Sequence, residues 1–93
     1  MYYLYILRSL NTNKFYVGIS DDPNRRLFEH NNSSHNTFTS KYRPWEIYYY
    51  FEVSSDMGVA MKVEKKVKKQ KNRTIYEKLK DASYRETFIS SVG

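Results

Sequence analysis

The sequence has no cysteine and no long apolar run. Without cysteine, the chain cannot form a disulfide scaffold, a cysteine-ligated zinc cluster or a thiol nucleophile. Arg8 interrupts the N-terminal apolar run after seven residues, which excludes a secretory signal, and no stretch approaches the length that spans a membrane. We therefore expect a soluble, cytoplasmic protein without a membrane partner.

The composition is typical of a folded domain. With 93 residues, the chain is long enough for one modest core and too short for two, so we expect a single domain over residues 1–93. The chain is 40% hydrophobic and 17% aromatic, and it includes ten tyrosines. This content of buriable side chains excludes a disordered chain. No repeat, low-complexity segment or linker interrupts it.

Positive charge is concentrated in one segment. Residues 60–80 hold nine Lys and Arg against two acidic residues, a net charge of +7, whereas the rest of the chain carries −1. Such a segment attracts polyanions through phosphate contacts and counterion release. The alternative is a lysine-rich helix face that only meets solvent.

Three segments have the pattern of β-strands. Residues 2–8 are almost entirely apolar or aromatic, which predicts a strand buried on both faces. Residues 15–20 follow the turn-forming segment 9–14, so the first two strands are expected to form an antiparallel hairpin. Residues 45–53 predict a third strand, whose better core face comprises Trp45, Ile47, Tyr49, Phe51 and Val53.

A first helix is predicted after the hairpin. Asp22 suits the N-cap and Pro23 the first helical position, where its missing N–H does no harm. This helix is expected to run to about Asn31, and the polar residues 33–44 that follow are expected to form a loop.

Two more helices are predicted after the third strand. Residues 54–56 cap a helix that extends to about Gln70, with an apolar stripe of Val59, Val63 and Val67. Thr74 is expected to cap a final helix that directs Ile75, Leu79 and Ala82 inward. The fold class is therefore α+β, a small three-stranded antiparallel sheet flanked by helices in the order ββαβαα.

Two helical positions carry candidate catalytic residues. Arg26 and His30 are one turn apart and project from the same face, at the border of the core. This spacing favours Arg26 over its neighbour Arg25. An exposed pair on a surface helix is the alternative.

Glu64 lies at the margin of an apolar stripe in a helix that is otherwise basic or apolar. It could form an i,i+4 ion pair with Lys68, which contributes a few tenths of a kcal/mol. It could instead hold Mg²⁺ jointly with a substrate phosphate, because Mg²⁺ prefers oxygen ligands and retains water. The spacing leaves both interpretations open.

Tyr5 and Tyr16 each occupy the centre of a predicted strand. Gly18 lies two residues after Tyr16 and therefore on the same face. A glycine there leaves a gap in the sheet surface, which permits close approach of another backbone or of a ligand.

With these residues in place, the sequence resembles the GIY-YIG nuclease superfamily. LYIL at 4–7 and YVG at 16–18 are similar to its motif pair. They have the variant form of small stand-alone bacterial proteins related to the nuclease domain of the excinuclease C subunit. The similarity continues through RRLFEHN at 25–31, FTSKYRPW at 38–45 and a helix of the form AxxxExxxKK at 60–69.

The resemblance assigns roles to residues of this chain. The matching catalytic positions are Tyr5, Tyr16, Arg26, His30 and Glu64, with Gly18 as the glycine of the second half-motif. Tyr3 stands where the first half-motif usually has glycine, and Val17 where the second has isoleucine. The asparagine that follows the glutamate in homing-type members has no counterpart, so its role is unfilled or passes to Lys68 or Lys69.

The resemblance also implies a mechanism. A single Mg²⁺ or Mn²⁺ on Glu64 polarises the scissile phosphate and stabilises the leaving 3′-oxygen. Arg26 offsets the charge that develops on the phosphate. Tyr5 acts as general base with a pKa lowered by the cation or by His30, and Tyr16 positions the water or the phosphate.

The implied function is a metal-dependent endonuclease that hydrolyses branched or duplex DNA, with a connection to DNA repair. A domain this small is expected to need a targeting partner protein. The expected nucleic-acid contacts are Lys62, Lys65, Lys66, Lys68, Lys69 and Lys71. The alternatives are a nucleic-acid-binding module that kept the fold without turnover, and a protein-interaction domain, whose binding would depend far less on salt.

Overall fold

The computed structural model describes residues 1–32, 38–70 and 72–92. The strands β1 (Tyr2–Ser9), β2 (Phe15–Ser20) and β3 (Trp45–Ser54) form one antiparallel sheet in the order β2-β1-β3. The helices are α1 (Pro23–Asn32), α2 (Phe38–Lys41), α3 (Met57–Lys69), α4 (Thr74–Lys78) and α5 (Ala82–Ser90). The predicted α+β class, the hairpin and the three-stranded antiparallel sheet are confirmed.

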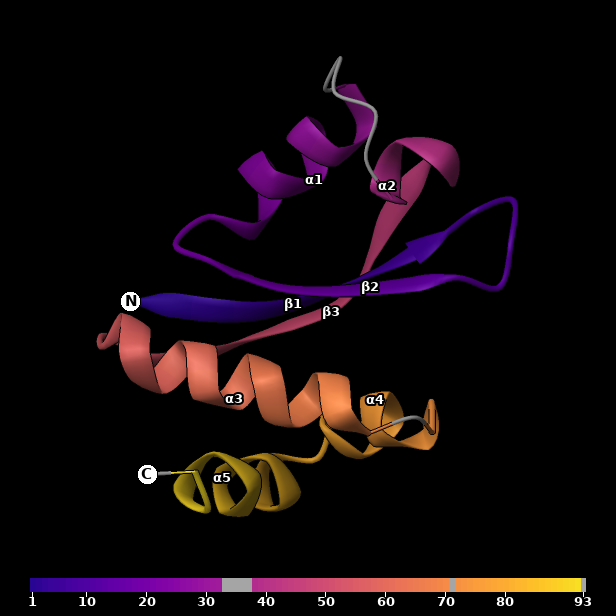
Figure 1. Cartoon of the computed structure of the whole chain (residues 1–93). Coiled ribbons are helices and arrows are strands. Elements are labelled where there is room, and N and C mark those ends of the chain that lie inside the picture. Colours follow the sequence, from indigo (N-terminus) through magenta and orange to yellow (C-terminus); the bar gives the residue numbers. More distant parts are fainter. Residues whose placement is uncertain (33–37, 71, 93) are drawn as a thin grey trace.

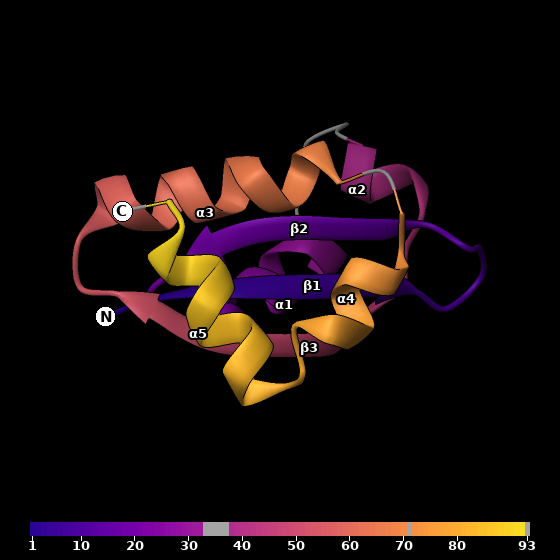
Figure 2. The same cartoon turned by 90° about the horizontal axis from the view of Figure 1, so that it is seen from below.

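The helices cover both faces of the sheet. Figure 1 shows α1 and α2 on one face and α3, α4 and α5 on the other. In the view from below, α3 runs along the β2 side of the sheet, whereas α4 and α5 lie beneath β1 and β3 (Figure 2). Because β2 is an edge strand, α3 lies next to an open edge.

The central strand β1 is buried on both faces, as predicted. Leu4 and Ile6 are fully buried in the core on the α3 side, together with Val63 and Val67. Tyr5 is almost fully buried in the smaller core on the α1 side, which also contains Leu7 and Trp45. Alternation along one strand thus supplies both cores.

A bulge in β3 changes the expected core face. Ile6 pairs with Tyr49 but Leu7 pairs with Ile47, so Tyr48 is an extra residue in β3. A bulge reverses the alternation of side chains beyond it. The predicted set is therefore split: Trp45 and Ile47 pack on the α1 side, and Tyr49, Phe51 and Val53 pack on the α3 side.

Capping residues define the helix starts. The Asp22 side chain accepts from the Arg25 backbone N–H at 3.1 Å, and Asp56 accepts from Gly58 and Val59 at the start of α3. Both caps were predicted. The loop expected over residues 33–44 instead contains α2, while residues 33–37 lie outside the described part of the chain.

The order ββαβαα is confirmed in outline, but the predicted final helix is divided in two. The chain forms α4 and α5 instead, because Asp81 caps a new helix by accepting from the Tyr84 backbone N–H at 2.9 Å. Thr74 does not cap α4; its own N–H donates to the Asn72 side chain at 3.0 Å. Ala82 is exposed, and Phe88 is the buried residue of α5.

Within the described residues, no helix is both long and apolar enough to cross a membrane.

Candidate active site at the open edge of the sheet

The Tyr5 ring lies across Gly18 on the α1 face of the sheet. The two residues are direct partners in the β1–β2 ladder. A Cβ at position 18 would lie 2.6 Å from Tyr5 Cζ and closer still to the hydroxyl oxygen, which no real contact allows. The gap predicted at Gly18 therefore exists, and a side chain of the same protein fills it.

The Tyr5 side chain on β1 contacts the His30 side chain on α1. The Tyr5 hydroxyl and His30 Nε2 are 3.0 Å apart in a buried hydrogen bond, and His30 is only 6% exposed in the last turn of α1. The Tyr16 ring lies beside both, with its centroid 4.8 Å from His30 and 6.3 Å from Tyr5. The two strand tyrosines and the helix histidine thus form one cluster.

Arg26 joins this cluster and Arg25 does not. The Arg26 guanidinium interacts with the Tyr5 hydroxyl, which raises the pKa of Arg26, and it pairs with Glu29 at 2.6 Å. Arg25 is half exposed and pairs with Asp21 at 2.7 Å. The helix face inferred from the spacing of Arg26 and His30 is the one that meets the tyrosines.

Burial determines the protonation states in the cluster. Burial, reinforced by the positive charge of Arg26, lowers the pKa of His30 to about 4, so the imidazole is neutral near pH 7. Burial also raises the pKa of the Tyr5 hydroxyl, and Arg26 opposes that rise only in part. The pKa of the Tyr5 hydroxyl is thus raised in this structure, whereas the resemblance implied that the cation or His30 lowers it.

Two residues that the sequence analysis missed hold His30. Thr39 Oγ1, from α2, lies 3.0 Å from His30 Nδ1 and is buried. Arg43 Nε donates to the His30 carbonyl oxygen at 2.6 Å. Both belong to the segment 38–45 that carried the family resemblance, and that resemblance was the one signal that pointed to them.

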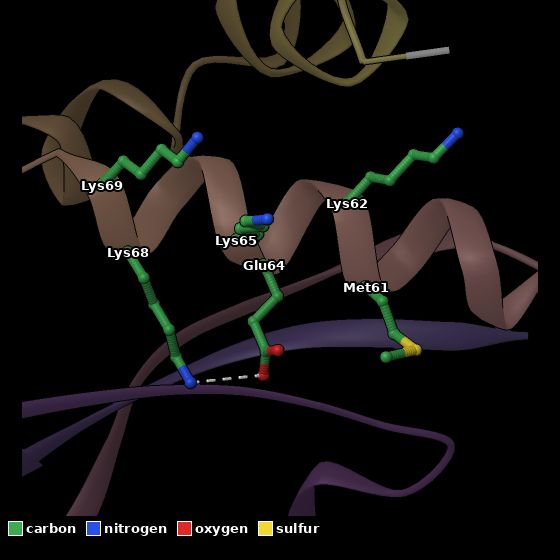
Figure 3. Close-up of a pocket in the computed structure, with 6 residues that line it drawn as sticks. All are labelled: Met61, Lys62, Glu64, Lys65, Lys68 and Lys69. Atoms are coloured by element: carbon green, nitrogen blue, oxygen red, sulfur yellow. Dashed lines mark ion pairs between the residues drawn. The ribbon is translucent and has the colours of Figure 1, made fainter.

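Glu64 approaches the cluster from the other layer. In Figure 3, Met61, Glu64 and Lys68 point from α3 toward the strands. Lys68 Nζ lies 3.6 Å from a Glu64 carboxylate oxygen and 5.6 Å from the Tyr16 ring centroid. The negative charge of Glu64 also contributes to the raised pKa of Tyr5. Charged side chains from helices on both faces of the sheet, Arg26 on α1 and Glu64 on α3, thus act on Tyr5.

Four of the six predicted lysines line one groove. A groove of about 500 Å³ runs along α3 and is lined by Met61, Lys62, Glu64, Lys65, Lys68 and Lys69. Lys66 is outside it, because its amine packs over the Phe88 ring and contacts Ser91. Lys71 lies outside the described residues.

The Glu64 carboxylate is the protein group in this groove that could hold a hard divalent cation. Its side chain is 23% exposed, so water and a substrate oxygen can reach the carboxylate. In the described part of the chain, three or more His, Asp or Glu side chains nowhere gather around one point. A single carboxylate supplemented by water and phosphate is a common arrangement for Mg²⁺.

These residues make a site suited to phosphodiester chemistry. A guanidinium lies with a neutral tyrosine–histidine pair, and the partly exposed carboxylate whose charge acts on that tyrosine lines a basic groove. Among known families, the model of the GIY-YIG catalytic domain matches residues 1–81. No curated protein matches the chain. Because the match covers most of the chain, and the sheet, helices and clustered tyrosines agree with it, this protein belongs to the GIY-YIG catalytic domain family and has a nuclease-type function.

Proposed function

We propose that this protein is a metal-dependent endonuclease that hydrolyses phosphodiester bonds of DNA. The observation that carries the proposal is the convergence of Tyr5, Arg26, His30 and Glu64, from one strand and two helices on opposite faces, at the open edge of β2. The pattern of two neutral hydrogen-bonded groups flanked by opposite charges is suited to moving a proton while charge develops nearby.

Tyr5 and His30 act together in the proposed proton transfer. As water attacks the phosphorus atom, it passes a proton to the Tyr5 oxygen while Tyr5 passes its own proton to His30 Nε2. The 3.0 Å hydrogen bond between them supplies the path. Tyr5 therefore need not ionise beforehand, which agrees with its raised pKa. The negative charge of a bound phosphate raises the proton affinity of His30.

Arg26 stabilises the charge that develops on the phosphate oxygens. It lies beside Tyr5, and its raised pKa keeps it positively charged during the reaction. Tyr16, which borders both His30 and Lys68, positions the water or the phosphate. Glu64 would hold one Mg²⁺ or Mn²⁺, which supplies Lewis-acid polarisation of the phosphate and stabilisation of the leaving 3′-oxygen.

The groove along α3 is proposed to receive the DNA backbone. Lys68 is paired with Glu64, so Lys62, Lys65 and Lys69 are the groove lysines best placed to contact phosphates. Such contacts are independent of base sequence. We further propose that a partner protein supplies substrate choice. Tyr3 and Val17 in the half-motifs favour the stand-alone branch related to the excinuclease C subunit.

The test is cleavage of a panel of linear, nicked, flapped and branched DNA substrates with Mg²⁺ or Mn²⁺. The variant Glu64→Gln should abolish cleavage without changing the melting temperature. Glu77→Gln is the matched control, because Glu77 is also a helical glutamate that pairs with a lysine, Lys80, at 3.5 Å. Glu77→Gln should cleave like the wild type.

Three outcomes would count against the proposal. Cleavage that persists in the presence of a chelator would show that the reaction does not need a metal. Full activity of Glu64→Gln would show that Glu64 is not the metal ligand. Salt-dependent DNA binding without cleavage of any substrate would favour a binding module that retains the nuclease fold.

A further inference from the structure

A continuous chain of buried side-chain hydrogen bonds runs from β1 to α2. Tyr5 Oη lies 3.0 Å from His30 Nε2, and His30 Nδ1 lies 3.0 Å from Thr39 Oγ1. The exposed fractions of the three residues are 1%, 6% and 4%. Both ring nitrogens of His30 are thus engaged by hydroxyl groups of buried residues.

The direction of these two hydrogen bonds depends on the tautomer of His30. A neutral imidazole donates from one nitrogen and accepts at the other. If Nδ1 carries the proton, it donates to Thr39, and Nε2 is free to accept the Tyr5 proton. If Nε2 carries the proton, it donates to the Tyr5 oxygen and blocks the transfer described above.

Thr39 is held in a fixed position beside the imidazole. Its carbonyl oxygen accepts from Trp45 Nε1 at 2.7 Å, and Trp45 is 3% exposed. The Trp45 backbone N–H donates to Asn31, the residue next to His30, at 2.7 Å. Arg43 donates to the His30 carbonyl from the same segment. The relative position of the imidazole and the threonine hydroxyl is therefore set by several bonds around them.

We propose that Thr39 is a positioning residue whose hydroxyl accepts a hydrogen bond from His30 Nδ1–H, so that Nε2 faces Tyr5 as an acceptor. This inference rests on the proposed nuclease function for its catalytic meaning. A hydroxyl orients the ring without adding charge, unlike a carboxylate at that place, which would favour the imidazolium. Among the described residues, the charged or titratable side chains near the ring are Arg26, Glu29, Arg43, Tyr5 and Tyr16.

The first test reads the tautomer directly and needs no substrate. The chain has two histidines, so the His35→Asn variant leaves His30 as the single imidazole in an ¹⁵N NMR spectrum. At pH 7 we expect Nδ1 protonated and Nε2 unprotonated. In that background Thr39→Val, which loses the hydroxyl at similar size, should give the other tautomer or a mixture, whereas Thr39→Ser should keep the original one.

The second test measures cleavage. Thr39→Val should lower kcat by about 10- to 100-fold with little change in KM, as loss of an orienting partner commonly does, and Thr39→Ser should restore most of it. Ser9→Ala is the matched control: its buried hydroxyl donates to the Tyr42 carbonyl at 2.8 Å, next to α2, without touching His30. This control should retain activity and tautomer.

The inference is overturned if wild-type His30 carries its proton on Nε2, or if Thr39→Val changes neither tautomer nor kcat. An equal loss of kcat in Ser9→Ala would also overturn it, since the cause would then be looser packing of α2. A wild-type protein that cleaves nothing would count against the proposed function, while the NMR result would still decide what Thr39 does to His30.

Discussion

Replacing Gly18 by alanine tests the packing on which the site depends. Alanine normally stabilises a strand position relative to glycine by about 0.5–1 kcal/mol. Here the new Cβ would lie 2.6 Å from Tyr5 Cζ, so the ring must move. Overpacking of this kind destabilises by about 1–3 kcal/mol. We expect a net destabilisation of about 1–2 kcal/mol.

The same substitution should slow cleavage by more than its loss of stability alone would cause. Moving the ring displaces the Tyr5 hydroxyl from His30 Nε2, with which it forms a 3.0 Å hydrogen bond. A misplacement of about 1 Å at a reacting group can slow a reaction about 100-fold. We therefore expect Gly18→Ala to fold and bind DNA but to cleave at least about 100-fold more slowly.

A double-mutant cycle isolates the clash. Tyr5→Leu removes the ring atoms that the Cβ would meet, so Gly18→Ala should stabilise the protein in that background, with a coupling of about 2 kcal/mol. Urea unfolding followed by fluorescence of Trp45, the single tryptophan, measures all four proteins. If Gly18→Ala alone is as stable and as active as the wild type, the close contact does not govern the site.

Three further predictions follow from charge. Arg26→Ala should slow cleavage by about 10²–10³-fold with little loss of DNA affinity, and Arg25→Ala, one position away and paired with Asp21, should not. If three groove lysines contact phosphates, a log–log plot of DNA affinity against salt concentration should have a slope of about −3. Changing Lys65 and Lys69 to glutamine should flatten this slope by up to about two units on unrelated sequences alike. A salt-independent affinity would contradict this. Because the pKa of His30 is about 4 when folded and about 6.5 when unfolded, its contribution to stability is complete above about pH 6.5 and is lost as the pH falls through 4. Urea midpoints at pH 7 and pH 4.5 should therefore differ more in the wild type than in His30→Gln.

Much of the fold could be predicted because its signals are local. The caps at Asp22 and Asp56 and the strand patterns depend on residues close together in the chain. The bulge at Tyr48 could not be predicted, since it is a property of how β3 pairs with β1. The break before α5 occurs because Asp81 caps a new helix. Local propensity allows either one continuous helix or two, so it does not predict the break.

The candidate site divides in the same way. Arg26 and His30 could be paired from helical periodicity alone, because one turn of α1 separates them. Their meeting with Tyr5 depends on the hairpin register that places Tyr5 opposite Gly18. The sequence predicts a gap at that glycine for another backbone or a ligand, and nothing in the pattern shows that the Tyr5 ring fills it.

The protonation states were the least predictable feature, and the reason is physical. The resemblance suggested a tyrosine made acidic by its neighbours, since Tyr5 was expected beside a cation and a histidine. In the folded protein, the same packing that brings Tyr5 and His30 to 3.0 Å also removes water from both, which favours the neutral form of each. Two neutral groups in contact can exchange protons only if their hydrogen bonds point the right way. The direction is therefore as important as the residues themselves, and the residue proposed to set it is Thr39, which lies 34 positions from Tyr5 in the chain.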